Sequence, residues 1–183
     1  MRLTIEYRRR HQDPKAADIE ISPKVIVLHY TAGGSADGTF KYFSGNHMEA
    51  ARPQLAAASD LNVSAHFLVD RDGTIYRLMP ETRMARHCIG LNHLAIGIEN
   101  VGDGKKWPLT AAQVEADARL VRFLAGRFPI THLIGHSEAQ RFEGHPYFLE
   151  RDPKYRTDKP DPGAAFMTAV RARVADLGLK GPP

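Results

Sequence analysis

Three short apolar runs of this chain each end in a side chain that could take part in catalysis. These side chains are His29 after residues 25–28, Glu99 after residues 96–98, and His136 after residues 133–135. Ligands of open α/β sheets bind beyond the carboxyl ends of the strands, and neighbouring strands lie about 5 Å apart. We therefore expect the three side chains to converge. Two imidazoles and a carboxylate suit a catalytic zinc ion, which takes about three protein ligands and keeps one position open.

Each of these residues also has a structural interpretation. A single histidine at a strand end is more often a hydrogen-bonded structural residue than a ligand, and the chain contains nine histidines, so they could cluster by chance. Asp161 stands before Pro162 at the start of an expected helix, which is a good N-cap signal. Lys159, taken alone, is a solvated loop lysine.

The elements that would position these residues alternate between strands and helices. Two strand-like runs, 64–70 and 74–78, flank an Asp72-Gly73 turn and predict a hairpin. A capping box formed by Thr110 and Gln113 opens a helix that Pro129 closes, and a last helix starts near Pro162. Alternating strands and helices predict an α/β fold, with one mixed central sheet flanked by helices in a single domain.

The remaining segments divide the chain into an N-terminal arm (1–21), the main domain (22–175) and a C-terminal tail (176–183). Within the arm, residues 3–7 have a strand-like pattern. A helix is expected after Ser35 as N-cap. Residues 46–60 form an Ala-rich helical stretch broken by Pro53, and a long loop covers 138–159.

The composition excludes several classes of protein. The chain has 183 residues, of which 43% are hydrophobic and 25% charged, as in an ordinary globular domain. No apolar run approaches the roughly 18 residues of a membrane span. A single cysteine, Cys88, excludes an internal disulfide framework and a thiolate zinc cluster. The N-terminus shows no secretory signal, so the chain as written is expected to be cytoplasmic, with export possible if a signal was removed. We expect a monomer.

The net charge of +4 favours an anionic partner only weakly. Nucleic acid, an anionic membrane and an acidic cell-wall polymer all fit that sign. The Arg8–Arg10 run is short, and the other basic residues are mixed with acidic ones. Because the chain has no nucleic-acid-binding motif and no basic-aromatic stripe, we expect no nucleic-acid partner.

Six sequence blocks, in order, resemble the type-2 N-acetylmuramoyl-L-alanine amidase family, which includes amidase-type phage lysozymes and the peptidoglycan recognition proteins. The blocks extend over about residues 22–175. They are VIVLHYTA (25–32), VSAHFLVDRDGTIY (63–76), ARHCIG (85–90) with Asn92, AIGIE (95–99), IGHSE (134–138) and KPDPG (159–163).

The resemblance implies a zinc hydrolase that cuts the amide between N-acetylmuramic acid and L-alanine in peptidoglycan or its fragments. The implied zinc ligands are His29, His136 and Asp161. Glu99 would activate the attacking water, and Lys159 would stabilise the oxyanion. The same fold also serves as a non-catalytic peptidoglycan-binding module, which is the alternative function.

The resemblance also indicates residues near the groove that could contact substrate. They are Tyr30, His66, His87 and Asn92. For His66, a purely structural role is an equal alternative. Both His66 and His87 could also contact the metal ligands and not the substrate. The chain departs from recycling enzymes of this family in the long segment 138–158, which we expect to fold over one side of the groove. His145 in that segment competes with His136 as a ligand.

Overall fold

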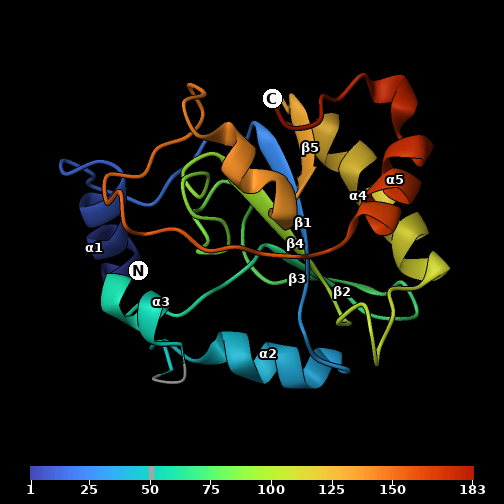
Figure 1. Cartoon of the computed structure of the whole chain (residues 1–183), viewed down its shortest axis with the longest axis horizontal. Coiled ribbons are helices and arrows are strands. Elements are labelled where there is room, and N and C mark those ends of the chain that lie inside the picture. The colour runs from blue at the N-terminus through green and yellow to red at the C-terminus, as the bar shows by residue number, and fades with distance from the viewer. Residues whose placement is uncertain (50–51) are drawn as a thin grey trace.

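A five-stranded mixed sheet forms the centre of the molecule, with the strand order β3-β2-β4-β1-β5 (Figure 1). The computed structural model describes residues 1–49 and 52–183. The strands are β1 (Val25–Tyr30), β2 (Phe67–Val69), β3 (Ile75–Arg77), β4 (Ala95–Asn100) and β5 (His132–Gly135). The predicted single α/β domain with a mixed central sheet is confirmed.

The register of the central strands brings the predicted chemistry to one edge of the sheet. β1 runs parallel to both β4 and β5, with His29 opposite Glu99 and Leu28 opposite Gly135. His136 follows Gly135 directly, so the carboxyl ends of the three strands present the three side chains side by side. The expectation that they gather at this edge is confirmed.

The predicted hairpin forms one edge of the sheet, with β3 as the edge strand. β2 pairs antiparallel with β3 and parallel with β4. Gly73 in the connecting turn has a φ of 87°, a conformation that glycine adopts without the strain that a side chain would add. The Asp72-Gly73 signal therefore predicted the turn for the right physical reason.

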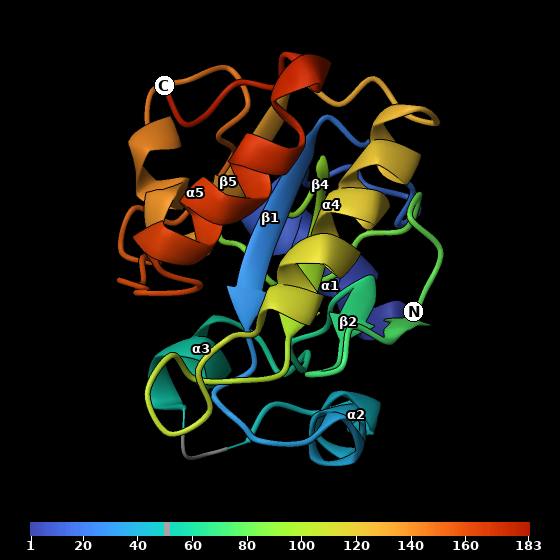
Figure 2. The same cartoon turned by 90° about the vertical axis from the view of Figure 1, so that its right-hand side faces the viewer.

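Two helices cover one face of the sheet, α4 (Ala111–Ala125) and α5 (Ala164–Arg173) (Figure 2). The Thr110–Gln113 capping box forms as predicted, with each side chain accepting a hydrogen bond from the other residue's backbone amide. Apolar residues of both helices pack on the strands. The residues in this contact include Ile26 and Ile96 of the strands, Val121 and Leu124 of α4, and Phe166 and Val170 of α5.

The opposite face is covered by shorter segments. A 3-10 helix, η1 (His136–Phe142), occupies the start of the segment predicted as a loop, and Phe142 packs with Val27 and Leu91. A second 3-10 helix, η2 (Ala175–Leu177), follows α5. The C-terminal segment then runs beside β5, where Leu133 N donates to Lys180 O at 3.0 Å. No helix in the described ranges is long and apolar enough to cross a membrane.

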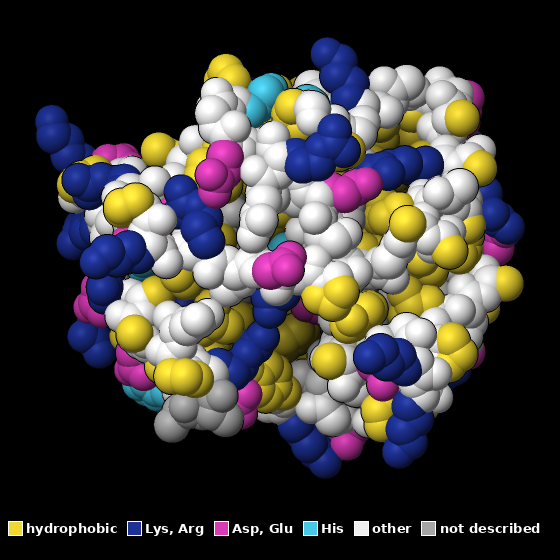
Figure 3. All heavy atoms as spheres, in the orientation of Figure 1, with side chains coloured by type: hydrophobic (Ala, Val, Ile, Leu, Met, Phe, Trp, Pro, Cys, Tyr) yellow, Lys and Arg dark blue, Asp and Glu magenta, His cyan; other side chains and the backbone are white. Residues whose placement is uncertain are grey.

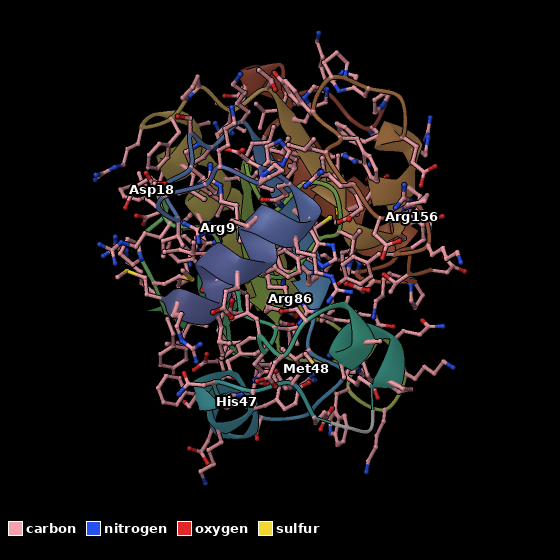
Figure 4. All side chains as sticks on the ribbon, turned by 90° about the vertical axis from the view of Figure 1, so that its left-hand side faces the viewer. Arg9, Asp18, His47, Met48, Arg86 and Arg156 are labelled. Atoms are coloured by element: carbon pink, nitrogen blue, oxygen red, sulfur yellow. The ribbon has the colours of Figure 1, made fainter. Side chains whose placement is uncertain are left out.

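The N-terminal arm is a helix, α1 (Arg2–His11), so the strand-like interpretation of residues 3–7 is wrong. Tyr7 and His11, one helical turn apart, are its buried residues and face the rest of the molecule. α1 packs near α3 (Pro53–Ala58), as Figures 1 and 4 show. Pro53 opens α3 at its first turn, where proline fits. Residues 50–51 of the predicted helical stretch lie outside the described residues.

The predicted helix after Ser35 is α2 (Ala36–Ser44), and the Ser35 hydroxyl caps it by accepting from Gly38 N. In Figure 2, α2 lies beyond the arrowhead of β1. α3 also lies near this edge of the sheet, because Leu55 lines the same cavity as His29 and Glu99.

Candidate metal centre and groove

His29, His136 and Asp161 meet at the carboxyl end of β1. His29 Nδ1 lies 3.0 Å from His136 Nδ1 and 3.2 Å from Asp161 Oδ2, and His136 Nδ1 lies 3.1 Å from the same oxygen. One potential ligand atom from each residue lies within 4.8 Å of the others. His29 is only 2% exposed. Two imidazole nitrogens and a carboxylate oxygen form a donor set that could hold a metal ion.

Asp161 belongs to this cluster and does not cap the following helix. α5 has Gly163 as its N-cap and receives no side-chain cap, which removes the capping interpretation. Burial raises the pKa of the Asp161 carboxyl, but the adjacent rings of His136 and His29 outweigh it and hold the pKa well below its usual range. The carboxylate is therefore ionised. Its backbone oxygen accepts from Ser137 N at 2.9 Å, which attaches this segment to η1.

Glu99 lies beside the cluster, opposite His29 in the sheet. Its carboxyl has a pKa raised to about 7, chiefly by burial; the charges of His29, Arg52 and Lys159 lower the pKa, and the charge of Asp161 raises it. Its Oε2 atom is buried and has no hydrogen-bond partner among the described residues. A buried, unpartnered carboxylate oxygen is costly, and it leaves a proton-accepting atom available at the cluster.

Lys159 lies two residues before Asp161 and lines the same groove. Burial and the positive charge of Arg52 lower the pKa of its ammonium group, while Asp161 and Glu99 raise it. Arg52 carries no signal in the sequence, because it stands at the start of an ordinary helix. Only its place in the fold, at the N-terminus of α3, brings it to the groove.

The groove is a cavity of about 510 Å³ that opens over the cluster. In Figure 3, the face seen is hollowed below its centre, with basic and hydrophobic side chains at the edge of the hollow. Its walls come from α2, α3, residues 86–89 and residues 155–161. Aromatic and cationic side chains on these walls include Tyr42, Phe43, Tyr155, Arg52 and Lys159.

The segment 138–158 contributes to one wall of this groove through Tyr155 and Thr157. His145 of the same segment lies elsewhere. Its ring packs 5.2 Å from that of Phe142 and 4.9 Å from that of Tyr147, and the cluster of ligand atoms contains His136 instead. The structure thus brings together the expected ligand set and leaves the competing histidine in an aromatic group.

The four residues expected to contact substrate have different surroundings. Tyr30, His87 and Asn92 line the groove. Asn92 is almost fully buried; its Oδ1 accepts from the backbone amides of His87 and Cys88, and its Nδ2 donates to Tyr7 Oη at 3.2 Å. These contacts use the Asn92 side chain to hold the backbone that carries His87.

His66 lies in the core and away from the groove wall. It is fully buried, with Nε2 2.8 Å from the Arg83 carbonyl oxygen and Nδ1 accepting from Gly97 N at 3.0 Å. Burial lowers its pKa to about 4. Because both ring nitrogens are used by backbone groups, these contacts favour the structural alternative.

His87 is partly exposed to the groove, and its ring lies against His29. Cys88 beside it is 1% exposed, and burial raises the pKa of its thiol. The family resemblance placed His87 near the groove, but the sequence carries no signal of its contact with His29, because the two lie 58 residues apart.

Comparison with known proteins supports a family assignment. The family N-acetylmuramoyl-L-alanine amidase (Amidase_2) matches residues 20–164. The 1,6-anhydro-N-acetylmuramyl-L-alanine amidase AmpD of Enterobacter cloacae is 28% identical over 170 residues, which are 85% of this chain and 81% of that protein.

Solved structures share the fold. The N-acetylmuramoyl-L-alanine amidase LysC of Clostridium intestinale superposes with a TM-score of 0.59 at 24% identity, covering 87% of this chain and 88% of that one. The N-acetylmuramyl-L-alanine amidase AmiD of E. coli, in complex with the substrate anhydro-N-acetylmuramic acid-L-Ala-D-gamma-Glu-L-Lys, gives 0.59 at 23% identity, covering 90% and 61%. Since the family match spans most of the chain and contains the whole ligand cluster, the chain belongs to the N-acetylmuramoyl-L-alanine amidase (Amidase_2) family.

Proposed function

We propose that the protein is a zinc-dependent hydrolase that cuts the amide between N-acetylmuramic acid and L-alanine in peptidoglycan or its soluble fragments. The observation that carries the proposal is the convergence of His29 Nδ1, His136 Nδ1 and Asp161 Oδ2 beside the unpartnered Oε2 of Glu99. In a member of this family, a complete donor set next to a free carboxylate oxygen argues against the alternative of a non-catalytic binding module.

The donor set fits zinc better than magnesium or calcium. Two imidazoles and one carboxylate are a usual ligand set of catalytic zinc, whereas magnesium and calcium prefer sites made of oxygen atoms. His29, His136 and Asp161 would hold the ion. When bound there, zinc would lower the pKa of water and polarise the scissile carbonyl.

The chain's own residues supply the proton transfers and part of the charge stabilisation. Glu99 Oε2 would take a proton from the attacking water and deliver it to the amide nitrogen as the C–N bond breaks. The products are the lactyl carboxylate of the muramic acid and the free α-amino group of L-alanine. Lys159 would place its positive charge near the oxygen of the tetrahedral intermediate.

Substrates of the relatives narrow the choice of assay. The AmpD relative is named for 1,6-anhydro-muramyl substrates, and the AmiD structure holds an anhydro-muramyl tripeptide. A stem peptide carries carboxylates, and Arg52 and Lys159 line the groove. We therefore propose muropeptides as the substrate class.

The test is the release of free stem peptide from purified muropeptides, followed by liquid chromatography and mass spectrometry. We expect cleavage by the zinc-loaded protein, loss of cleavage with a chelator, and recovery when zinc is returned. Parallel assays on intact sacculi and soluble anhydro-muropeptides identify the preferred form. A folded, zinc-loaded protein that binds muropeptides but cuts none of them would show a binding module instead.

A further inference from the structure

The second ring nitrogen of His29 lies against another histidine, His87. His29 Nε2 lies 3.0 Å from His87 Nδ1, and the two rings meet edge to face with their planes at 89°. His87 Nε2 in turn lies 3.2 Å from the carbonyl oxygen of Ala95 at the start of β4. A chain of two hydrogen bonds thus runs from the backbone of the sheet to a metal ligand.

The direction of these hydrogen bonds follows from the acceptor at the end of the chain. A carbonyl oxygen only accepts, so His87 Nε2 must carry a hydrogen. A neutral imidazole has one ring hydrogen, so His87 Nδ1 is an acceptor and His29 must donate to it from Nε2. His29 Nδ1 then keeps its lone pair, and this is the atom that faces His136 and Asp161.

We propose that His87 is a positioning residue that holds His29 in the tautomer and orientation in which Nδ1 binds the metal. The inference rests on the metal site of the proposed function. It gives His87 a different role from the substrate contact expected from the sequence, because both of its ring nitrogens are already engaged. In metal sites generally, the partner of a ligating histidine fixes its tautomer, and losing that partner weakens metal binding or activity about 10- to 100-fold.

The surroundings of His87 are built to hold its ring in place. A Cβ atom on Gly97 would lie 2.6 Å from His87 Cγ, so the ring occupies space that only a glycine leaves open. His66 Nδ1 accepts from the Gly97 amide, and the His66 ring meets that of His87 edge to face, with 5.9 Å between ring centroids. Asn92 holds the backbone amide of His87 at 2.9 Å. Ring and backbone are therefore fixed by separate contacts.

The experiment compares the zinc affinity of wild type, His87→Gln and His87→Asn by competition with a chromogenic chelator. Asparagine can place an acceptor oxygen near the position of Nδ1, whereas glutamine places its polar group near Nε2 and leaves His29 Nε2 without an acceptor. We expect about 10- to 100-fold weaker zinc binding in His87→Gln and recovery of most of that loss in His87→Asn. Equal zinc affinity in wild type and His87→Gln would overturn the proposal.

A control and a measurement on the unmodified protein separate positioning from folding. His66→Gln removes a buried histidine that touches Gly97 but not His29, and we expect it to lower stability without weakening zinc binding. In metal-free wild type, long-range proton–nitrogen NMR spectra should show His29 and His87 both protonated at Nε2. Protonation of His29 at Nδ1 would contradict the proposal even if the His87 variants failed to fold.

The outcomes also separate this inference from the proposed function. Wild type that binds zinc but cuts no muropeptide would refute the amidase activity and leave the role of His87 standing. Cleavage of muropeptides by wild type, together with an unchanged zinc affinity of the His87→Gln variant, would support the amidase activity and refute the role of His87. Wild type that binds no zinc would refute the metal site and the inference together.

Discussion

Glu99 and Lys159 carry opposite charges, and burial shifts both pKa values toward the neutral forms. Burial raises the pKa of the Glu99 carboxyl to about 7 and lowers that of the Lys159 ammonium. A carboxylate with a raised pKa is a stronger base than an ordinary glutamate. The proton acceptor Glu99 and the positively charged Lys159 therefore line the same groove.

Replacing the proton acceptor tests its assigned role. Glu99→Gln keeps the size of the side chain but cannot take up a proton, so we expect kcat to fall about 10²- to 10⁴-fold. Zinc content should stay at the wild-type level, because Glu99 is not a member of the ligand cluster. Metal analysis and muropeptide turnover measure the two effects. Unchanged turnover would remove Glu99 from the mechanism.

Replacing the lysine tests charge stabilisation in the transition state. Lys159→Met keeps the length of the side chain and removes its charge, so we expect kcat to fall about 10²- to 10³-fold, as for other oxyanion donors. KM should change less, since the oxyanion exists only during the reaction. Steady-state kinetics separate the two parameters. A rise in KM alone would assign Lys159 to substrate binding.

At the scale of elements, α1 connects parts of the groove wall that lie far apart in sequence. His11 Nδ1 lies 2.9 Å from Glu150 Oε1 and its Nε2 3.0 Å from the Ala58 carbonyl oxygen. Nearby, Arg86 donates to the Leu55 carbonyl oxygen and to Tyr155 Oη. In Figure 4, Arg86 lies between α1 and α3. α1 thereby joins the end of α3 to the segment 138–158.

The stability contributed by α1 is measurable at Tyr7, which is 1% exposed. Tyr7→Phe removes the hydroxyl that accepts from Asn92, and we expect the free energy of unfolding to fall by about 1 kcal/mol. Tyr7→Ala also removes the buried ring, and we expect a loss of about 3–5 kcal/mol. Urea denaturation of metal-free protein gives both values. Equal, small losses would show that α1 is only loosely attached.

Elements with local signals could be predicted, and those that depend on distant partners could not. The Asp72-Gly73 turn and the Thr110–Gln113 capping box act within a few residues, so the sequence contains all that they need. Leu3, Ile5 and Tyr7 alternate as in a strand, yet α1 is a helix because Tyr7 and His11 bury one face against Arg86 and Tyr155.

The candidate site divides in the same way. His29, Glu99 and His136 could be predicted because each follows an apolar strand, and strand ends meet at one sheet edge. The pattern of residues alone left Asp161 as a cap, and its place in the ligand set came from family resemblance. The contact of His87 with His29 gave no local signal, since Gly97 makes room for it from another strand.

At the scale of the whole molecule, two buried titratable groups give stability opposite dependences on pH. In the folded protein the pKa of His66 is lowered from 6.5 to about 4. Its contribution to stability is therefore lost as the pH falls from about 6.5 to about 4. Burial raises the pKa of Asp117, on the inner face of α4, to about 7, although a hydrogen bond from Asn100 lowers it. The contribution of Asp117 is therefore lost as pH rises from about 4 to 7.

Asp117→Asn should remove the loss of stability that Asp117 causes as the pH rises. Asparagine can still accept the hydrogen bond from Asn100 Nδ2 but does not ionise. The free energy of unfolding of the variant, relative to wild type, should therefore increase as pH rises from 4 to 8. Urea denaturation of metal-free protein across this range measures the difference. A difference that stays constant with pH would show that Asp117 is not protonated in the folded protein.

The helices α1 and α5 lie almost wholly outside the stretch that the family match covers, which runs from residue 20 to residue 164. A fragment cut to that stretch would lose Tyr7, whose hydroxyl bonds Asn92, and Phe166 and Val170, which cover the sheet. It would keep every proposed metal ligand and still expose apolar surface on both sides. For protein engineering, the unit to transplant is therefore longer than the unit by which the family is recognised.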